Sequence, residues 1–217
     1  LQDIPSPYLS GALDAFFELP LIPMIETTRG CPFKCPFCAD GLASKNSIAR
    51  FNSERVEAEL SYIGERVRQV DDLIITDLNF GMYKQDVATV EGIAEVENKN
   101  SWPIIVTAAM GKNMPDRVIE AAAILKGSWK IGSSVQSWDS EVLENIDRSN
   151  ISLDAYNQFI DFANNQGPNA EPYTELILGL PGDSLQKHFK SLRRGIESGA
   201  KNIRIHQAIL LLSLIHI

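Results

Sequence analysis

The sequence predicts an α/β fold in which parallel strands alternate with helices along the chain. Six short apolar segments recur between residues 20 and 210, and five segments with helical apolar spacing lie between them. The apolar residues of the short segments come in unbroken runs, as expected for strands that helices cover on both faces. Strands and helices in this order form a parallel sheet with right-handed crossovers.

The predicted strands cover residues 20–27, 71–79, 103–109, 129–137, 174–180 and 202–210. No Gly-x-Gly-x-x-Gly sequence follows the first strand, which weakens the alternative of a dinucleotide-binding fold. The pattern alone does not decide whether the sheet curls into a barrel or stays open. A length of 217 residues is compatible with one α/β barrel or with two ordinary domains.

Three of the predicted helices have regular apolar faces, with steps of three and four residues that fall on one side of a helix. The faces are Val56, Leu60, Ile63 and Val67; Leu153, Tyr156, Ile160 and Ala163; and Leu185, Phe189, Leu192 and Ile196. Two weaker helices are expected over residues 86–97 and 115–126, and a proline suits the first turn of the second. All five are expected to be amphipathic.

Composition indicates a globular protein. The chain is 44% hydrophobic and 22% charged, with a formal net charge of −8. No run of Lys and Arg is present that would neutralise phosphates, so coating nucleic acid or an anionic membrane is not the expected function. No segment reaches the roughly 18 apolar residues that span a bilayer. We expect a cytoplasmic protein.

The last six residues, Leu212–Ile217, are what the codons CTG TCT CTT ATA CAC ATC encode. That string matches a transposon end used in DNA-library preparation, so we expect native coding to stop near Leu211 and the tail to be a cloning scar. At the other end, Leu1 follows no initiator methionine, and we expect the native chain to begin upstream.

All three cysteines lie within eight residues, as Cys31-x-x-x-Cys35-x-x-Cys38. They follow the first predicted strand at its carboxyl end, where α/β folds carry their ligand loops. A structural zinc site usually needs four Cys or His ligands, and the native histidines His188 and His206 lie far downstream.

Two further interpretations of the cysteines are weaker than an iron–sulfur site. A disulfide framework usually has an even number of cysteines in a secreted protein. A redox pair of Cys35 with Cys38 would leave Cys31 without a task. An iron–sulfur cluster usually takes four thiolates, so three thiolates leave one iron open for a reaction.

This cysteine motif, with Phe37 directly before the last cysteine and a βα repeat around it, resembles the radical S-adenosylmethionine (SAM) superfamily. The resemblance implies a [4Fe-4S] cluster held by Cys31, Cys35 and Cys38, with the fourth iron chelated by SAM. It implies reductive cleavage of SAM to methionine and a 5′-deoxyadenosyl radical, with electrons from a low-potential donor such as flavodoxin or ferredoxin. The implied fold is a partial (β/α)6 barrel over residues 22–211, incomplete and open on one side.

Three segments match parts of that family that contact SAM. TDLNFG, after the second strand, stands where the family has a Gly-Gly-Glu type motif for the SAM amino group. SSVQSWDSEVLENIDR, after the fourth strand, matches the segment that contacts ribose and carboxylate, and LILGLPGDS, in the fifth, matches the adenine-contact strand. The implied contact residues are Asp77, Asn79, Gly81, Ser134, Gln136, Ser137, Arg148, Gly179, Leu180 and Pro181.

Several of these roles have alternatives. TDLNFG departs from the common form of its motif, so the contact is made by Asp77 or Asn79. Arg148 suits a carboxylate because its guanidinium binds in a bidentate manner, or it is a surface arginine that caps a helix end. Phe37 covers the cluster or packs near the adenine, or it is a core residue.

Residues 1–21 resemble the linker that joins an upstream cobalamin (B12)-binding domain to the radical domain in one branch of the superfamily. The implied reaction is B12-dependent methyl transfer or a rearrangement on a small-molecule or modified-biomolecule substrate. The alternative is a structural zinc or electron-transfer iron–sulfur domain without SAM chemistry. An enzyme acting on RNA would need a basic accessory domain, and none is visible, so nucleic acid is not an expected partner. No catalytic acid or base is assigned.

Overall fold

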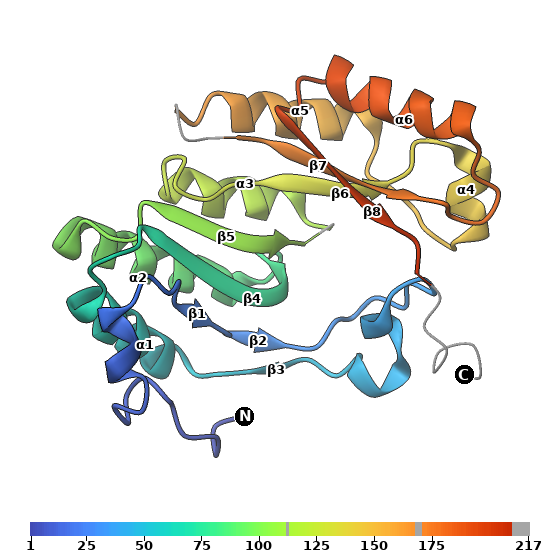
Figure 1. Ribbon diagram of the computed structural model, residues 1–217. Coiled ribbons are helices and arrows are strands. Elements are labelled where there is room, and N and C mark those ends of the chain that lie inside the picture. Colours follow the sequence, from blue (N-terminus) through green and yellow to red (C-terminus); the bar gives the residue numbers. More distant parts are fainter. Residues whose placement is uncertain (112, 168–170, 210–217) are drawn as a thin grey trace. The chain divides into compact units, whose positions relative to one another are not determined.

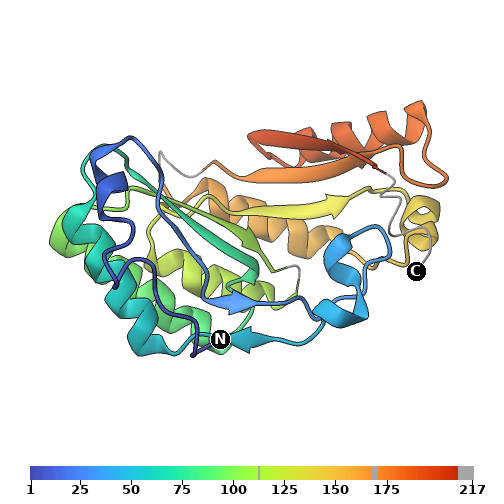
Figure 2. The same cartoon turned by 60° about the horizontal axis from the view of Figure 1, so that its bottom comes forward.

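The computed structural model describes residues 1–111, 113–167 and 171–209 (Figures 1 and 2). The predicted scar at residues 212–217 lies outside these described residues. The chain forms two compact units. The described part of the first unit consists of residues 1–29, 48–111, 113–131 and 166–167, and that of the second of residues 30–47, 132–165 and 171–209.

In the described part of the first unit, three parallel strands form a sheet with the order β1–β4–β5. The strands are β1 (Met24–Ile25), β4 (Asp72–Phe80) and β5 (Ile105–Met110). The helices are α1 (Ser53–Arg66), α2 (Lys84–Asn100) and α3 (Pro115–Ile124), and α2 contacts both α1 and α3. The predicted helices and parallel strands of this region are confirmed.

Helix α1 illustrates why these elements form. The side chain of Asn52 accepts a hydrogen bond from the backbone N–H of Arg55 at 3.1 Å, which caps the helix start. Val56, Leu60 and Ile63 then fall on one face and are buried, as their spacing predicts. Burying each of these side chains contributes about 2 kcal/mol to folding.

Burial along β4 alternates, unlike the expectation drawn from its apolar run. Leu73, Ile75, Asp77 and Asn79 are buried, whereas Thr76 between them is exposed. A strand that alternates in this way is buried on one face only. Two polar side chains are therefore buried at the carboxyl half of β4, where the parallel sheet presents its ligand-binding end.

A short antiparallel pair of strands, β2 (Thr28–Arg29) and β3 (Ala49–Arg50), also belongs to the first unit. Thr28 pairs with Arg50 and Arg29 with Ala49. The sequence did not predict this pair. It holds together the two ends of the segment that contains the cysteines.

In the second unit, as far as the structure describes it, β6 (Gly132–Gln136), β7 (Tyr173–Leu178) and β8 (Asn202–Gln207) form a parallel sheet in that order. The helices are α4 (Ser140–Asn145), α5 (Leu153–Asn164) and α6 (Leu185–Glu197). Figures 1 and 2 show α5 and α6 on one side of this sheet. The strand order follows the chain order, as in a barrel, and no closed barrel is present among the described residues.

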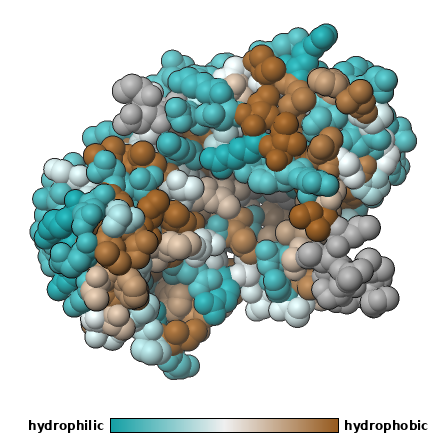
Figure 3. Space-filling model, viewed as in Figure 1, coloured by the Kyte–Doolittle hydropathy of each residue, from teal (hydrophilic) through white to brown (hydrophobic). Residues whose placement is uncertain are grey.

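Helix α6 lies where the sequence predicts it, but its predicted apolar face is not the buried face. Leu185, Phe189 and Ile196 are 67%, 59% and 66% exposed. The buried residues are His188, Ser191 and Gly195. Figure 3 shows hydrophobic residues on the surface in the upper region, where Figure 1 places α6 and β8.

The small residues of α6 explain which face is buried. A Cβ atom on Gly195 would lie 3.0 Å from Cγ2 of Thr174 in β7, so the helix backbone approaches the sheet closely there. The hydroxyl of Ser191 accepts a hydrogen bond from the backbone N–H of Trp138 at 2.9 Å. Close backbone packing and this hydrogen bond place the polar face of α6 against the sheet.

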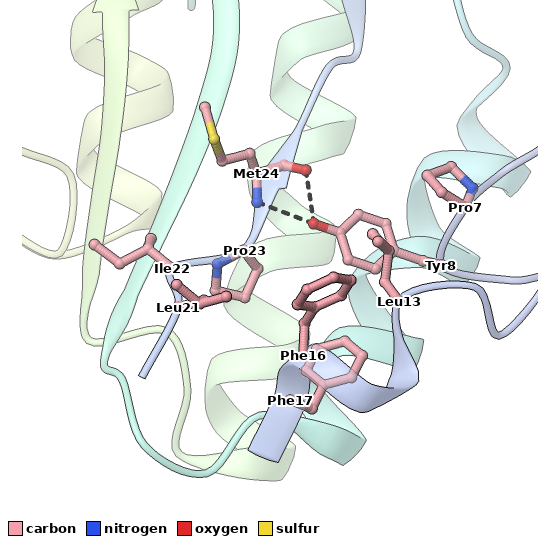
Figure 4. A pocket seen from close by; sticks show the side chains of 9 residues that line it. All are labelled: Pro7, Tyr8, Leu13, Phe16, Phe17, Leu21, Ile22, Pro23 and Met24. Carbon is pink, nitrogen blue, oxygen red and sulfur yellow. Dashed lines mark hydrogen bonds between the residues drawn. The ribbon is translucent and has the colours of Figure 1, made fainter. Parts of the chain in front are cut away.

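The N-terminal segment packs on the first unit around an apolar pocket of about 330 Å³ (Figure 4). The Tyr8 hydroxyl donates a hydrogen bond to the Met24 carbonyl at 2.9 Å and accepts one from the Met24 N–H at 3.0 Å. A short 3₁₀ helix, Asp14–Glu18, contributes Phe16 and Phe17 to the wall. The pocket is lined by Pro7, Tyr8, Leu13, Phe16, Phe17, Leu21, Ile22, Pro23 and Met24.

This lining carries no carboxylate, imidazole or thiol among the residues that the structure places there, so it offers packing rather than chemistry. The interpretation of residues 1–21 as a linker stays a prediction. None of the helices that the structure describes is both long enough and apolar enough to cross a bilayer.

Candidate functional site

The cysteine loop folds back on itself within the second unit. The Cys31 N–H donates to the Lys45 carbonyl at 3.0 Å, and the Cys38 N–H donates to the Cys35 carbonyl at 3.1 Å. The side-chain amide of Asn46 donates to the carbonyls of Cys31 (3.0 Å) and Phe33 (3.1 Å). Two 3₁₀ turns, Ala39–Gly41 and Ala43–Lys45, complete the loop.

Two glycines permit this close folding. Gly30 has a φ of +101°, and a Cβ atom there would lie 2.2 Å from the Ser47 carbonyl oxygen. A Cβ atom on Gly41 would lie 2.3 Å from the Cys35 carbonyl oxygen. Real Cβ atoms do not approach so closely, so the loop geometry requires glycine at both positions.

The three thiols fit the predicted cluster by their chemistry. Cys31, Cys35 and Cys38 are half-buried and form no disulfide in the described part of the chain. Among the described residues, no three Cys, His, Asp or Glu side chains are arranged as a finished metal site. The thiols must therefore reorient to share one cluster, and three thiolates on one short loop are the donor set that leaves an iron open.

Phe37 packs into an apolar cluster of the second unit. Its half-buried ring lies against the buried side chains of Val142, Ile146 and Leu180. Val142 belongs to α4, Ile146 directly follows that helix, and Leu180 lies two residues after the end of β7. This packing ties the cysteine loop to the ends of two other elements, and it agrees with the interpretation of Phe37 as a core residue.

Arg148 lies beside the cysteine loop and is half-buried rather than on the surface. Cys35, Cys38 and Glu175 all act on the charge of its guanidinium. Its Cζ atom lies 5.9 Å from the centroid of the Phe37 ring. Burial lowers the pKa of Arg148, while Cys35, Cys38 and Glu175 oppose that effect.

The residues at the end of β6 differ in how their polar atoms are used. The Ser134 hydroxyl donates to the Glu175 carboxylate, and the Ser137 hydroxyl accepts from the Asp139 N–H at 3.1 Å. Oε1 of Gln136 is buried and has no hydrogen-bond partner among the described residues. Gln136 also has a φ of +64°, a conformation that is costly for a residue other than glycine. An unpartnered buried acceptor in a strained conformation marks Gln136 as the ligand-binding candidate of this group.

The end of β7 leaves space beside its backbone. Gly179 has a φ of +82°, and a Cβ atom there would meet no described atom within 4 Å. Leu180 is buried in the cluster with Phe37. The Pro181 carbonyl accepts a hydrogen bond from the Asn145 side chain at 3.1 Å. A flat ring could approach the open backbone at Gly179 without a side chain in its way.

The remaining predicted residues lie in the first unit. Asp77 is 2% exposed and accepts hydrogen bonds from the Thr27 N–H at 2.7 Å and from the Thr27 hydroxyl. Burial raises the pKa of Asp77, and Thr27 and Thr28 oppose that effect. Asn79 is buried, and its carbonyl accepts from the Met82 N–H at 3.3 Å.

Asp77 therefore joins β4 to the end of β1 and the start of β2. Gly81, two residues after Asn79, has a φ of +82°, and a Cβ atom there would lie 2.8 Å from the Trp129 ring. The glycine is thus required for packing within the first unit.

A buried carboxylate that sequence reasoning missed is Asp86, in the first turn of α2. It accepts a hydrogen bond from the Tyr83 N–H at 2.9 Å and lies 3.8 Å from the guanidinium of Arg50. Arg50 in turn stacks 4.0 Å from the Tyr83 ring centroid. Burial raises the pKa of Asp86 to about 6. The only sequence signal was an acidic residue near a helix start, which is common at exposed helices as well.

Comparison with known proteins decides the family. A family model described as the radical SAM superfamily matches residues 25–194. This chain belongs to the radical SAM superfamily. The prediction from the cysteine motif is confirmed, and the cofactors of this superfamily are a [4Fe-4S] cluster and SAM.

Two curated relatives are similar over nearly the whole chain. One is the cobalamin-dependent radical SAM methyltransferase TokK of Streptomyces tokunonensis, 34% identical over 220 residues. The other is the 2-(S-pantetheinyl)-carbapenam-3-carboxylate methyltransferase of Streptantibioticus cattleyicolor, 33% identical over 218 residues. The alignments cover 95% and 94% of this chain but 31% of each relative. The chain thus spans about a third of the length of these relatives.

Solved radical SAM structures share the fold. The methyltransferase TsrM of Kitasatospora setae, with cobalamin and a [4Fe-4S] cluster bound, matches with a TM-score of 0.72 at 12% identity over 88% of this chain and 35% of its own. HemN of Escherichia coli, a coproporphyrinogen III oxidase, matches with a TM-score of 0.64 at 15% identity over 99% of this chain and 50% of its own. The α/β fold with parallel strands that the sequence predicts is that of radical SAM enzymes.

Proposed function

We propose that this chain is the radical SAM core of a cobalamin-dependent methyltransferase that acts on a small molecule. Support for methyl transfer comes from the two relatives at 34% and 33% identity, both of which are named methyltransferases. The observation that carries the proposal in this chain is the folded loop with Cys31, Cys35 and Cys38. A cytoplasmic location and an electron donor such as flavodoxin or ferredoxin stay predictions.

When bound, a [4Fe-4S] cluster and SAM would supply the electron and the reactive carbon–sulfur bond. Cys31, Cys35 and Cys38 would hold the cluster. The loop hydrogen bonds from Asn46 keep their backbone in place, and the packing of Phe37 limits the access of water on that side. No residue of this chain is assigned to cobalamin.

The second unit also offers groups that suit the rest of SAM. Oε1 of Gln136 would accept a hydrogen bond from a ribose hydroxyl, because that buried atom needs a donor. The open backbone beside Gly179 would admit the adenine ring.

The test is anaerobic reconstitution of the protein with iron and sulfide, compared with a Cys38→Ser variant. We expect the wild type to bind about four iron ions per chain, to show an electron paramagnetic resonance (EPR) signal after reduction by dithionite, and to cleave SAM. The variant should lose cluster and cleavage together. A colourless protein that purifies with zinc, or a cluster whose EPR spectrum ignores SAM, would show that the alternative without SAM chemistry is correct.

Methyl transfer is tested separately in the full-length protein, which includes the expected upstream cobalamin-binding domain, by adding cob(I)alamin and SAM and following the absorbance of methylcobalamin. We expect the wild type to form methylcobalamin faster than buffer alone. A protein that cleaves SAM but neither retains cobalamin on gel filtration nor methylates it would be a radical SAM enzyme of another branch.

A further inference from the structure

We propose that Arg148 is a positioning residue for the cluster itself: its guanidinium is held beside the cysteine loop and raises the reduction potential of the cluster. The proposal rests on the proposed function, since it requires that the loop binds a cluster. It assigns Arg148 a role different from the predicted contact to the SAM carboxylate.

The direction of the Arg148 side chain is fixed by groups outside the cysteine loop. Its Nε donates to Oδ1 of Asn150 at 3.1 Å, and Nη2 donates to the Ser134 carbonyl. Asn150 is itself held, because its amide donates to the carbonyls of Val135 and Ser137, both at 2.9 Å. The end of β6 therefore orients the guanidinium before any cofactor binds.

With these bonds made, the guanidinium still lies beside the cysteine loop. Cys35 and Cys38 both act on its charge. The half-buried Phe37 ring lies 5.9 Å from Cζ and belongs to an apolar cluster. Charges interact more strongly in such a partly water-excluded place than at an open surface.

The acidic residue that acts on Arg148, Glu175, already interacts with two other residues. Glu175 accepts from the Ser134 hydroxyl, and its carboxylate lies 3.6 Å from the guanidinium of Arg204. The positive charge of Arg148 is therefore not neutralised by a dedicated carboxylate among the described residues. It remains available to the negative charge of the three thiolates.

The electrostatic consequence follows from the charge change on reduction. One electron from an external low-potential reductant converts [4Fe-4S]²⁺ to [4Fe-4S]⁺, so the bound cluster becomes more negative by one charge. A fixed positive charge beside the cluster stabilises that reduced form more than the oxidised form. Arg148 should thus make the cluster easier to reduce by the external donor, while it lowers the driving force for electron transfer from the cluster to SAM.

The test is an EPR-monitored redox titration of the reconstituted protein in the absence of SAM. We expect Arg148→Gln, which keeps an N–H donor but removes the charge, to shift the midpoint potential to a more negative value. Arg148→Lys keeps the positive charge but lacks the planar guanidinium that Asn150 and Ser134 orient, so it should shift the midpoint potential less. The matched control is Arg204→Gln, which removes the same charge from an exposed residue that pairs with Glu175, and it should leave the potential close to that of the wild type.

Iron and sulfide are measured for each variant. If Arg148→Gln has a full cluster and the potential of the wild type, the proposal is wrong. If it instead keeps that potential and loses only the change that SAM causes in the EPR spectrum, Arg148 binds the SAM carboxylate.

If Arg148→Gln does not hold a cluster, the decisive variant is Asn150→Ala, which releases the guanidinium but keeps its charge. A more negative potential in Asn150→Ala supports the proposal, and an unchanged one overturns it. A wild type that takes up no cluster contradicts the proposed function, which is a different outcome from an unchanged potential.

Discussion

Replacing Asp86 by Asn should change how stability depends on pH. Burial, the largest cause, and the charge of Asp77 raise the pKa of Asp86 from 3.8 to about 6, against the opposing effect of Tyr83, Arg50 and Gly81. Between these values the folded protein holds a proton that the unfolded chain has released. Folding thus takes up a proton there, and the free energy of unfolding falls as the pH rises from about 4 to 6. A difference of about 2 pH units corresponds to about 3 kcal/mol.

Asp86→Asn keeps an oxygen that can accept from the Tyr83 N–H but cannot ionise. Relative to the wild type, this variant should gain up to about 3 kcal/mol between pH 4 and pH 7. The measurement is urea unfolding of the cluster-free protein, followed by tryptophan fluorescence at several pH values in that range. Asp116→Asn, at an exposed position in the first turn of α3, controls for removal of a carboxylate at a helix start. Parallel stability curves for the wild type and Asp86→Asn would refute the reasoning.

Three further predictions concern the loop and the core. Gly41→Ala places a methyl group 2.3 Å from the Cys35 carbonyl oxygen, so the iron and sulfide bound per chain should fall several-fold. Gly179→Ala should keep its cluster and lower the free energy of unfolding by about 1 kcal/mol, because only the backbone is strained there. Asn46→Ala removes two hydrogen bonds to the loop, each worth about 1 kcal/mol, and should speed the loss of iron to a chelator. Equal rates of iron loss in the variant and the wild type would contradict this prediction. Leu60→Ala empties a fully buried site and should cost about 2 to 5 kcal/mol in urea unfolding, and a smaller loss would mean that the core collapses around the cavity.

Helices and strands could be predicted where burial imposes a period on the sequence. The faces of α1 and α5 are buried as their spacing indicates. In α6 the same kind of spacing indicates a helix but not its buried side, because Gly195 and Ser191 allow a closer approach to the sheet than Leu185 and Phe189 would. Spacing reports which residues share a face, and it does not report the fit of that face to a neighbour.

The short pair β2–β3 could not be predicted for a different reason. Each strand has two residues, too few to show any alternation, and the partners Thr28 and Arg50 are both polar. Similarly, the hydrogen bonds from Thr27 to Asp77 join residues 50 positions apart. Such contacts depend on the parallel pairing of β1 with β4, which brings the two chain segments together.

The predicted site residues differ in whether their polar atoms already have hydrogen-bond partners within the protein. The oxygens of Asp77 and the hydroxyls of Ser134 and Ser137 already have partners within the protein. Oε1 of Gln136 is buried without a partner among the described residues, a cost of about 1 to 3 kcal/mol that a ligand donor would remove. A sequence motif specifies residue types only, so it does not distinguish residues with hydrogen-bond partners from residues without them. Only the hydrogen bonds separate them, and on that basis Gln136 should affect the binding of SAM while Ser134 and Ser137 affect the fold around it.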